Sequence, residues 1–122
     1  MLKVLVVDDD PDLLEMVALS LQGAGMDVLS ISDAVLLNAS VESFQPACIL
    51  MDIYLGPFDG RTLCHDLKTL GPAKDIPVIL YSAGHIDNAS ITESLCEDFI
   101  SKPFDTAQLL QKIRLLSGDI PA

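Results

Sequence analysis

Short aliphatic runs alternate along this chain with longer amphipathic stretches, and this alternation constrains the fold more than any other feature. The runs cover residues 3–7, 27–31, 47–51, 78–81 and 99–101. A continuous apolar run is typical of a strand buried on both faces, and strands separated by helical stretches pair in parallel through crossover connections. The pattern therefore predicts an α/β domain, with a doubly wound, five-stranded parallel sheet flanked by five helices.

Capping residues and apolar spacing locate the helices. Asp10 followed by Pro11 is typical of a helix start, and Gly23 or Gly25 would end that first helix. Ser32 is predicted to cap the second helix, and Asp105 the last one. Residues 84–98 favour only a short or irregular helix. The core-facing residues recur at helical spacing; they are Leu14, Val17, Ala18 and Leu21, then Leu37, Val41 and Phe44, then Leu63, Leu67 and Leu70, and finally Leu109, Ile113 and Leu116.

The composition is typical of one folded domain. The chain has 122 residues, 50% of them hydrophobic, which gives room for one core but not for two. Residues 1–117 are predicted to form the domain, and residues 118–122 a tail or the start of a linker. No apolar stretch reaches the about 18 residues that a membrane span needs. Since the N-terminus also enters a predicted strand at once, we expect neither a membrane segment nor a signal peptide.

The net charge indicates which partners the chain can bind, and the cysteines indicate the compartment in which it works. Eighteen acidic and seven basic residues give a net charge of -11, which disfavours direct binding to nucleic acid and to anionic membranes. The three cysteines, Cys48, Cys64 and Cys96, are an odd number with no Cys-x-x-Cys spacing. Such cysteines are typical of thiols in a reducing compartment. We therefore expect a cytoplasmic protein whose acidic excess suits a divalent metal ion or a basic partner.

Polar side chains follow four of the five predicted strands, at the points where the strands end. They are Asp8 and Asp9 after the first strand, Asp52 after the third, Ser82 after the fourth and Lys102 after the fifth. Each alone has an ordinary explanation, such as a helix cap, a structural hydrogen bond, a turn serine or a surface lysine. Ligands of parallel α/β sheets bind outside the carboxyl ends of the strands. The coincidence of these residues therefore favours one shared site.

These residue types suit phosphoryl chemistry. Crowded carboxylates repel one another, and Mg²⁺ relieves the repulsion while keeping open positions for phosphate oxygens. Asp52 stands alone on a central strand and faces the acidic pair, so it is the best candidate to attack phosphorus and form an acyl phosphate. Lysine and hydroxyl donors neutralise charge on a transferred group.

With this set and spacing, the chain resembles the receiver domains of two-component response regulators over residues 3–116. The motifs that carry the resemblance are Val6-Val7-Asp8-Asp9-Asp10-Pro11, Leu50-Met51-Asp52 with Asp59-Gly60 downstream, Leu80-Tyr81-Ser82-Ala83, and Phe99-Ile100-Ser101-Lys102-Pro103-Phe104. The resemblance implies a flavodoxin-like sheet with strand order 2-1-3-4-5. It also implies a cis peptide bond between Lys102 and Pro103.

The resemblance further implies a role for each site residue. Asp52 would be the phosphoacceptor and Lys102 its cationic partner, while Ser82 and Phe99 would be switch residues. The Mg²⁺ ligands would be Asp8, Asp9, Asp52 and the backbone carbonyl of Tyr54. Asp10 matches no ligand position and stays a helix cap.

Several residues depart from the family pattern. Gly56 stands where many members have proline, which predicts a different path for the loop after Asp52. Phe99 lacks the hydroxyl of the commoner tyrosine. Tyr54 and Gly84 hold the positions that flank the path of the attacking water in receivers. A bulky side chain at one and no side chain at the other predict slow loss of the phosphoryl group.

The resemblance implies a signalling module that takes its phosphoryl group from a histidine kinase or a histidine phosphotransfer domain. An output domain or a second copy of the chain would be its further partner. One alternative is a Mg²⁺-dependent phosphohydrolase with an aspartyl-phosphate intermediate, although Tyr54 stands where its general acid would be expected. Another is a degenerate receiver that only binds partners, which the intact acidic set disfavours. We expect a receiver that catalyses only its own phosphorylation and dephosphorylation.

Overall fold

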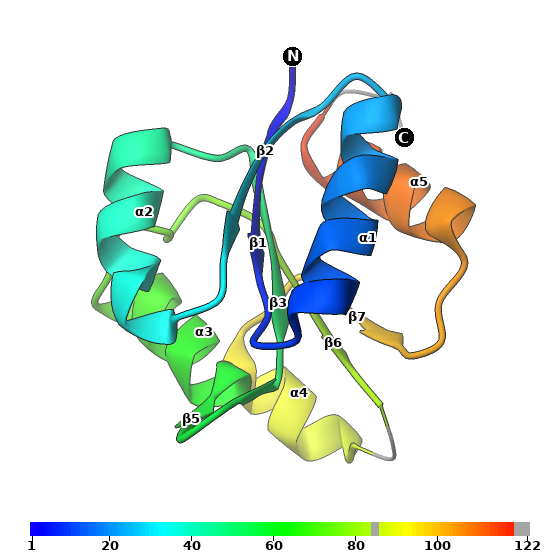
Figure 1. Ribbon diagram of the computed structural model, residues 1–122. Helices are drawn as coiled ribbons and strands as arrows, with labels where there is room; N and C mark the ends of the chain where they lie inside the picture. The colour runs from blue at the N-terminus through cyan, green and yellow to red at the C-terminus, as the bar shows by residue number, and fades with distance from the viewer. Residues whose placement is uncertain (84–85, 119–122) are drawn as a thin grey trace.

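In the computed structural model, which describes residues 1–83 and 86–118, five parallel strands form one sheet (Figure 1). The strands are β1 (Lys3–Val7), β2 (Asp27–Ile31), β3 (Cys48–Asp52), β6 (Val78–Ser82) and β7 (Asp98–Ser101). Their order in the sheet is β2-β1-β3-β6-β7. Counted along the chain, this is the predicted order 2-1-3-4-5, so the flavodoxin-like fold is confirmed.

The burial of the strands follows their place in the sheet. Every residue of β3 and β6 is buried, whereas β2 and β7 are partly exposed. The central strands are covered on both faces, so the aliphatic runs of the sequence contribute apolar area on both sides. The partial exposure of β2 agrees with its predicted place at an edge.

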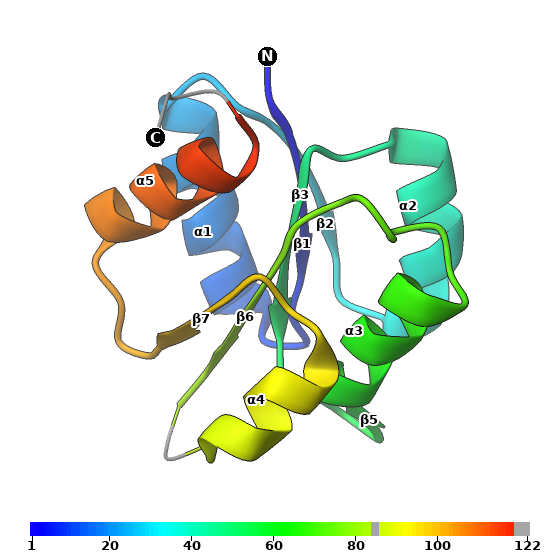
Figure 2. The same ribbon diagram turned by 180° about the vertical axis from the view of Figure 1, so that it is seen from behind.

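Helices cover both faces of the sheet, as Figures 1 and 2 show from opposite sides. The helices α1 (Pro11–Gly23) and α5 (Thr106–Leu116) lie on one face, and α2 (Leu37–Phe44), α3 (Gly60–Thr69) and α4 (Asn88–Ser94) lie on the other. The helix residues that complete the core are Val17, Leu21, Leu109 and Ile113 on the first face and Leu37, Val41, Cys64 and Leu67 on the second.

Two of the predicted helix caps are confirmed and one is wrong. Asp10 caps α1 with Pro11 in its first turn, and Asp105 caps α5. The predicted cap Ser32 does not start α2. Instead, the Asp33 side chain accepts from the backbone N–H of Val35 and starts a short 3₁₀ helix, η1 (Ala34–Leu36), which runs on into α2.

The third helix faces the core with a different set of residues from the predicted one. Leu70 is 88% exposed because it lies at the C-cap, one residue beyond the end of α3. Cys64 is fully buried in its place, next to Leu67 along the helix face. The fourth helix is short, as predicted, and spans only Asn88–Ser94.

A short hairpin follows β3 where the sequence predicted only a loop. Its strands are β4 (Tyr54–Leu55) and β5 (Phe58–Asp59), which pair antiparallel. Gly56 lies in the connecting turn with a φ of 62°, in the left-handed region that favours glycine. The loop after Asp52 thus has a defined path, and it returns directly into α3.

Two further expectations concern the thiols and the membrane. Cys48 is a free, buried thiol, and burial raises its pKa to about 12. None of the helices in residues 1–83 and 86–118 combines the length and the apolar character that a membrane span needs. Of the predicted tail, residues 119–122 lie outside the described part of the chain.

Candidate functional site

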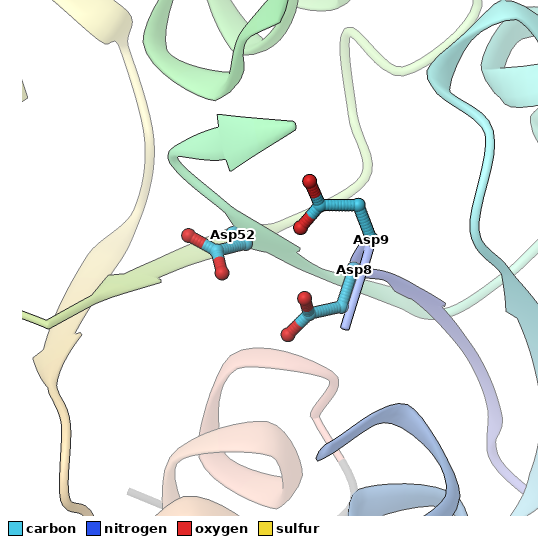
Figure 3. A group of neighbouring side chains, drawn as sticks. All are labelled: Asp8, Asp9 and Asp52. Atoms are coloured by element: carbon cyan, nitrogen blue, oxygen red, sulfur yellow. The ribbon is translucent and has the colours of Figure 1, made fainter. Parts of the chain in front are cut away.

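Three carboxylates meet at the carboxyl ends of β1 and β3. Asp8 and Asp9 directly follow β1, and Asp52 is the last residue of β3. Because β1 and β3 are paired neighbours with Val7 opposite Met51, the two strand ends lie side by side, as Figure 3 shows. One carboxylate oxygen from each of the three residues lies within 4.8 Å of the other two. The structure thus brings the predicted acidic set together.

The three carboxylates differ in burial. Asp8 is fully buried and Asp52 is 5% exposed, whereas Asp9 is exposed. Asp8 Oδ1 accepts from the backbone N–H of Asp10 at 2.9 Å, and its Oδ2 accepts from the hydroxyl of Tyr81 at 2.6 Å. Burial nevertheless raises the pKa of the Asp8 carboxyl, because loss of water outweighs the two hydrogen bonds.

Asp52 is held by one donor on each carboxylate oxygen. The backbone N–H of Tyr54 donates to its Oδ1 at 2.9 Å, and Lys102 Nζ donates to its Oδ2 at 2.8 Å. Lys102 reaches this place from the end of β7, and its peptide bond to Pro103 is cis, as expected. Lys102 Nζ lies farther from Asp8, at 3.8 Å from Oδ2.

The chemistry of this donor set fits a hard divalent cation. The cluster holds three carboxylates and the Lys102 ammonium, which lies near Asp52 and Asp8, so the carboxylates outnumber the ammonium. Each carboxylate oxygen that accepts one hydrogen bond retains further lone-pair capacity. An all-oxygen anionic set is what Mg²⁺ prefers.

The remaining predicted site residues are Ser82, Tyr54, Phe99 and Gly84. Ser82 is fully buried at the end of β6, and its hydroxyl donates to the backbone carbonyl of Ala83 at 2.9 Å rather than to Asp52. The Tyr54 side chain is 57% exposed. Phe99 on β7 is half-buried against the core on the α2 and α3 side. Gly84 lies outside the described residues.

Sequence reasoning missed two contacts that shape the site. The backbone N–H of Gly56, in the unpredicted hairpin, donates to Asp9 Oδ2 at 3.1 Å. The Tyr81 hydroxyl binds Asp8 although the two residues are 73 positions apart. The signal for the second contact was present, because a tyrosine in a buried strand usually finds a hydrogen-bond partner for its hydroxyl.

Comparisons with known proteins agree with this geometry. The family model for the response regulator receiver domain matches residues 4–114. The DNA-binding dual master transcriptional regulator RpaA of Synechocystis is 35% identical over 116 residues, which are 93% of this chain and 48% of that protein. The DNA-binding response regulator MtrA of Mycolicibacterium smegmatis is 31% identical over 92% of this chain and 49% of its own length. The chain therefore spans about half the length of these curated relatives.

A solved structure gives the same picture in three dimensions. The BeF₃-activated N-terminal receiver domain of Klebsiella pneumoniae RstA superposes with a TM-score of 0.85 at 29% identity. The similarity covers 94% of this chain and 97% of that one. The likeness thus extends over nearly the whole chain.

Proposed function

This chain belongs to the response regulator receiver domain family, and on that premise we propose that a phosphoryl group on Asp52 switches it between two signalling states. The observation that carries the proposal is the meeting of Asp8, Asp9 and Asp52 with Lys102 at the carboxyl ends of parallel strands. The family match favours this function over that of a phosphohydrolase.

The side chains of Asp8, Asp9 and Asp52, with the backbone carbonyl of Tyr54, are proposed to hold Mg²⁺. When bound, the ion would neutralise the oxygens of an incoming phosphoryl group. The hydrogen bonds to Asp8 from the Tyr81 hydroxyl and the Asp10 backbone hold this ligand in place without blocking all its lone pairs. The exposed Asp9 is held in turn by the Gly56 backbone.

In the proposed transfer, a carboxylate oxygen of Asp52 attacks the phosphorus of a phosphohistidine on a histidine kinase or a phosphotransfer domain. The O–P bond of an acyl phosphate forms, the P–N bond breaks, and the imidazole of the partner leaves with the electron pair. Lys102 Nζ, now 2.8 Å from Asp52 Oδ2, would follow the negative charge onto the phosphoryl oxygens.

Ser82 and Phe99 are proposed to pass the change on to the surface. The Ser82 hydroxyl would leave the Ala83 carbonyl and bind a phosphoryl oxygen, and Phe99 would repack. Two charge-assisted hydrogen bonds, from Ser82 and Lys102, supply roughly 3–6 kcal/mol. Reversing a population from 1:99 to 99:1 needs about 5.5 kcal/mol. Because Lys102 gives up its bond to Asp52 and Ser82 its bond to the Ala83 carbonyl, only the difference between the new and the old bonds favours the switched state. The figure of roughly 3–6 kcal/mol is therefore the upper bound of what these two bonds contribute to the switch.

The relatives RpaA and MtrA are named as DNA-binding regulators, which supports an output domain as the recipient of the signal. A second copy of the chain is the other proposed recipient. Both proposals concern the partner that would bind the phosphorylated domain. The phosphoryl chemistry itself depends only on the residues at the strand ends.

The direct test mixes the chain with Mg²⁺ and acetyl phosphate and follows the intact mass. We expect one phosphoryl group per chain in the wild type and none in Asp52→Asn, with similar thermal unfolding of the two proteins. Asp12→Asn, which changes an exposed aspartate of α1 outside the cluster, should be labelled like the wild type. Labelling of Asp52→Asn, or continued turnover of acetyl phosphate without labelled protein, would contradict the proposal.

A further inference from the structure

Tyr81 touches both halves of the proposed site, although no motif of the sequence assigns it a role. It is fully buried on β6. Its hydroxyl donates to Asp8 Oδ2 at 2.6 Å, and its ring centroid lies 4.8 Å from Lys102 Nζ. The ring is also fixed from the side by Phe104, in an edge-on contact with centroids 5.7 Å apart. One rigid side chain thus contacts both a proposed metal ligand and the proposed phosphoryl-binding lysine.

Two donors lie near Asp8 Oδ2, but only one of them is close enough to form a hydrogen bond. The Tyr81 hydroxyl donates a hydrogen bond to this oxygen at 2.6 Å, and Lys102 Nζ lies 3.8 Å from it. An ammonium bonded to a carboxylate stands at about 2.7–2.9 Å. By that measure Lys102 is bonded to Asp52, at 2.8 Å, and not to Asp8. A movement of about 1 Å would exchange these partners.

We propose that Tyr81 is a positioning residue that keeps Lys102 on Asp52 by supplying Asp8 with its donor. The inference rests on the proposed function, because that function makes Asp8 a Mg²⁺ ligand. Asp8 is fully buried, and a buried carboxylate that loses a donor takes the nearest replacement. Without the Tyr81 hydroxyl that replacement is the Lys102 ammonium. A buried Asp8–Lys102 ion pair would then have to break before Asp8 could bind a cation.

The test is a double-mutant cycle read by calorimetric titration with Mg²⁺ alone, without a phosphodonor. The four proteins are the wild type, Tyr81→Phe, Lys102→Met and the double variant. We expect Tyr81→Phe to weaken Mg²⁺ binding about tenfold, within the range known for residues that orient metal ligands. With Lys102→Met present, the competing ammonium is gone, so Tyr81→Phe should change the affinity by less than about twofold.

Ser94→Ala is the matched control, because it removes another buried hydroxyl, one that donates to the Ile91 backbone on α4. It should leave the Mg²⁺ affinity unchanged. A crystal structure of metal-free Tyr81→Phe gives a second, independent readout. Lys102 Nζ should there lie within hydrogen-bond distance of Asp8 Oδ2.

Equal Mg²⁺ affinity of the wild type and Tyr81→Phe would overturn the inference, and so would the same loss of affinity with and without Lys102. In the crystal structure, a Lys102 that stays on Asp52 would overturn it as well. These failures differ from failure of the proposed function. The latter would appear as a wild-type chain that binds Mg²⁺ as the inference requires but takes no phosphoryl group on Asp52.

Discussion

At the residue scale, the side chain of Tyr54 is proposed to set how fast water removes a phosphoryl group from Asp52. The backbone of Tyr54 is tied to Asp52 Oδ1, while its side chain is 57% exposed. A large aromatic ring beside a phosphoryl group on Asp52 would leave less room for an attacking water molecule and would orient it poorly. Since positioning supplies most of the catalysis in phosphoryl transfer, the Tyr54 side chain should prolong the life of the acyl phosphate.

Replacing Tyr54 by Asn should therefore speed hydrolysis, by about tenfold or about 1.4 kcal/mol of barrier. The measurement is the loss of phosphoryl label in Mg²⁺ after removal of the donor. Phe58→Asn is the matched control, because Phe58 is an exposed aromatic on the other strand of the same hairpin. Equal rates for Tyr54→Asn and the wild type would show that Tyr54 does not set the lifetime.

Among the helices, α3 begins directly against the backbone at the end of β3, the strand that carries Asp52. Its first residue, Gly60, is buried against the backbone of Asp52 and Ile53 and donates to the Ile53 carbonyl at 2.7 Å. A Cβ atom at this position would clash with the carbonyl oxygen of Asp52 and would lie 2.9 Å from Ile53 Cα. The element can begin here only because residue 60 has no side chain.

Gly60→Ala should thus destabilise the fold by roughly 1–3 kcal/mol, the usual cost of overpacking. Gly23→Ala is the matched control, because Gly23 is also a helical residue but has nothing within 4 Å of its would-be Cβ. That change should be neutral or stabilise by up to about 1 kcal/mol. Urea unfolding of both variants makes the comparison, and a Gly60→Ala protein as stable as Gly23→Ala would refute the packing argument.

The start of α3 also carries a pH-dependent ion pair. Arg61 Nη2 lies 2.7 Å from Asp59 Oδ2, and hydrogen bonds from Arg61 hold the pKa of the Asp59 carboxyl below 3.8. A depressed carboxyl pKa contributes stability that is present above the unfolded value and is lost as the pH falls through the folded value. The Asp59 side chain is 42% exposed, so this contribution is less than about 1 kcal/mol.

Asp59→Asn should lower the free energy of unfolding at pH 7, since asparagine keeps the cap but loses the charge. The deficit should begin to shrink below about pH 4, where the Asp59 carboxyl of the unfolded wild type takes up a proton before that of the folded protein does. The measurement is the free energy of unfolding of both proteins by denaturant at several pH values between 7 and 3. In an Arg61→Gln background the pH dependence of the same substitution should become clearly weaker, with a remainder from the backbone N–H of residue 61, which also donates to Asp59. An undiminished dependence there would exclude the Arg61 side chain as its main cause.

At the scale of the whole molecule, binding of an ion at this site would be coupled to folding. The carboxylates come from β1 and β3, and Lys102 from β7, so the site exists only when the sheet is formed. A ligand that binds only the folded state stabilises it by mass action. At ten times its dissociation constant the gain is about 1.4 kcal/mol.

We accordingly expect Mg²⁺ at that concentration to raise the thermal midpoint by roughly 4–6 °C. Asp9→Ala should abolish this shift, because Asp9 is exposed and can be replaced without a buried cavity. Asp12→Ala removes the same charge from the nearby first turn of α1, and it should keep the shift. A full shift in Asp9→Ala would place the metal elsewhere.

The sequence by itself determined the sheet, its helical connections and the strand ends at which the site forms. Apolar runs such as residues 78–81 are stable only when they are buried on both faces of the sheet. Local caps such as Asp10 act within one turn of the chain. The polar residues that interrupt the runs, above all Asp8 and Asp52, therefore had to collect at one edge. Periodicity and capping are local properties, which is why they could be predicted from the sequence.

Tertiary structure alone decided the contacts that join distant segments. The sequence could not show that Tyr81 would bind Asp8, or that Gly56 would turn its backbone N–H toward Asp9. Helical spacing also predicted a buried Leu70, but α3 ends one residue earlier, so Leu70 lies beyond the helix and is exposed. A hydrogen bond between distant residues depends on the final register of the strands and on the angle at which each element packs. Those are fixed only when the whole core closes, because each depends on all its neighbours at once.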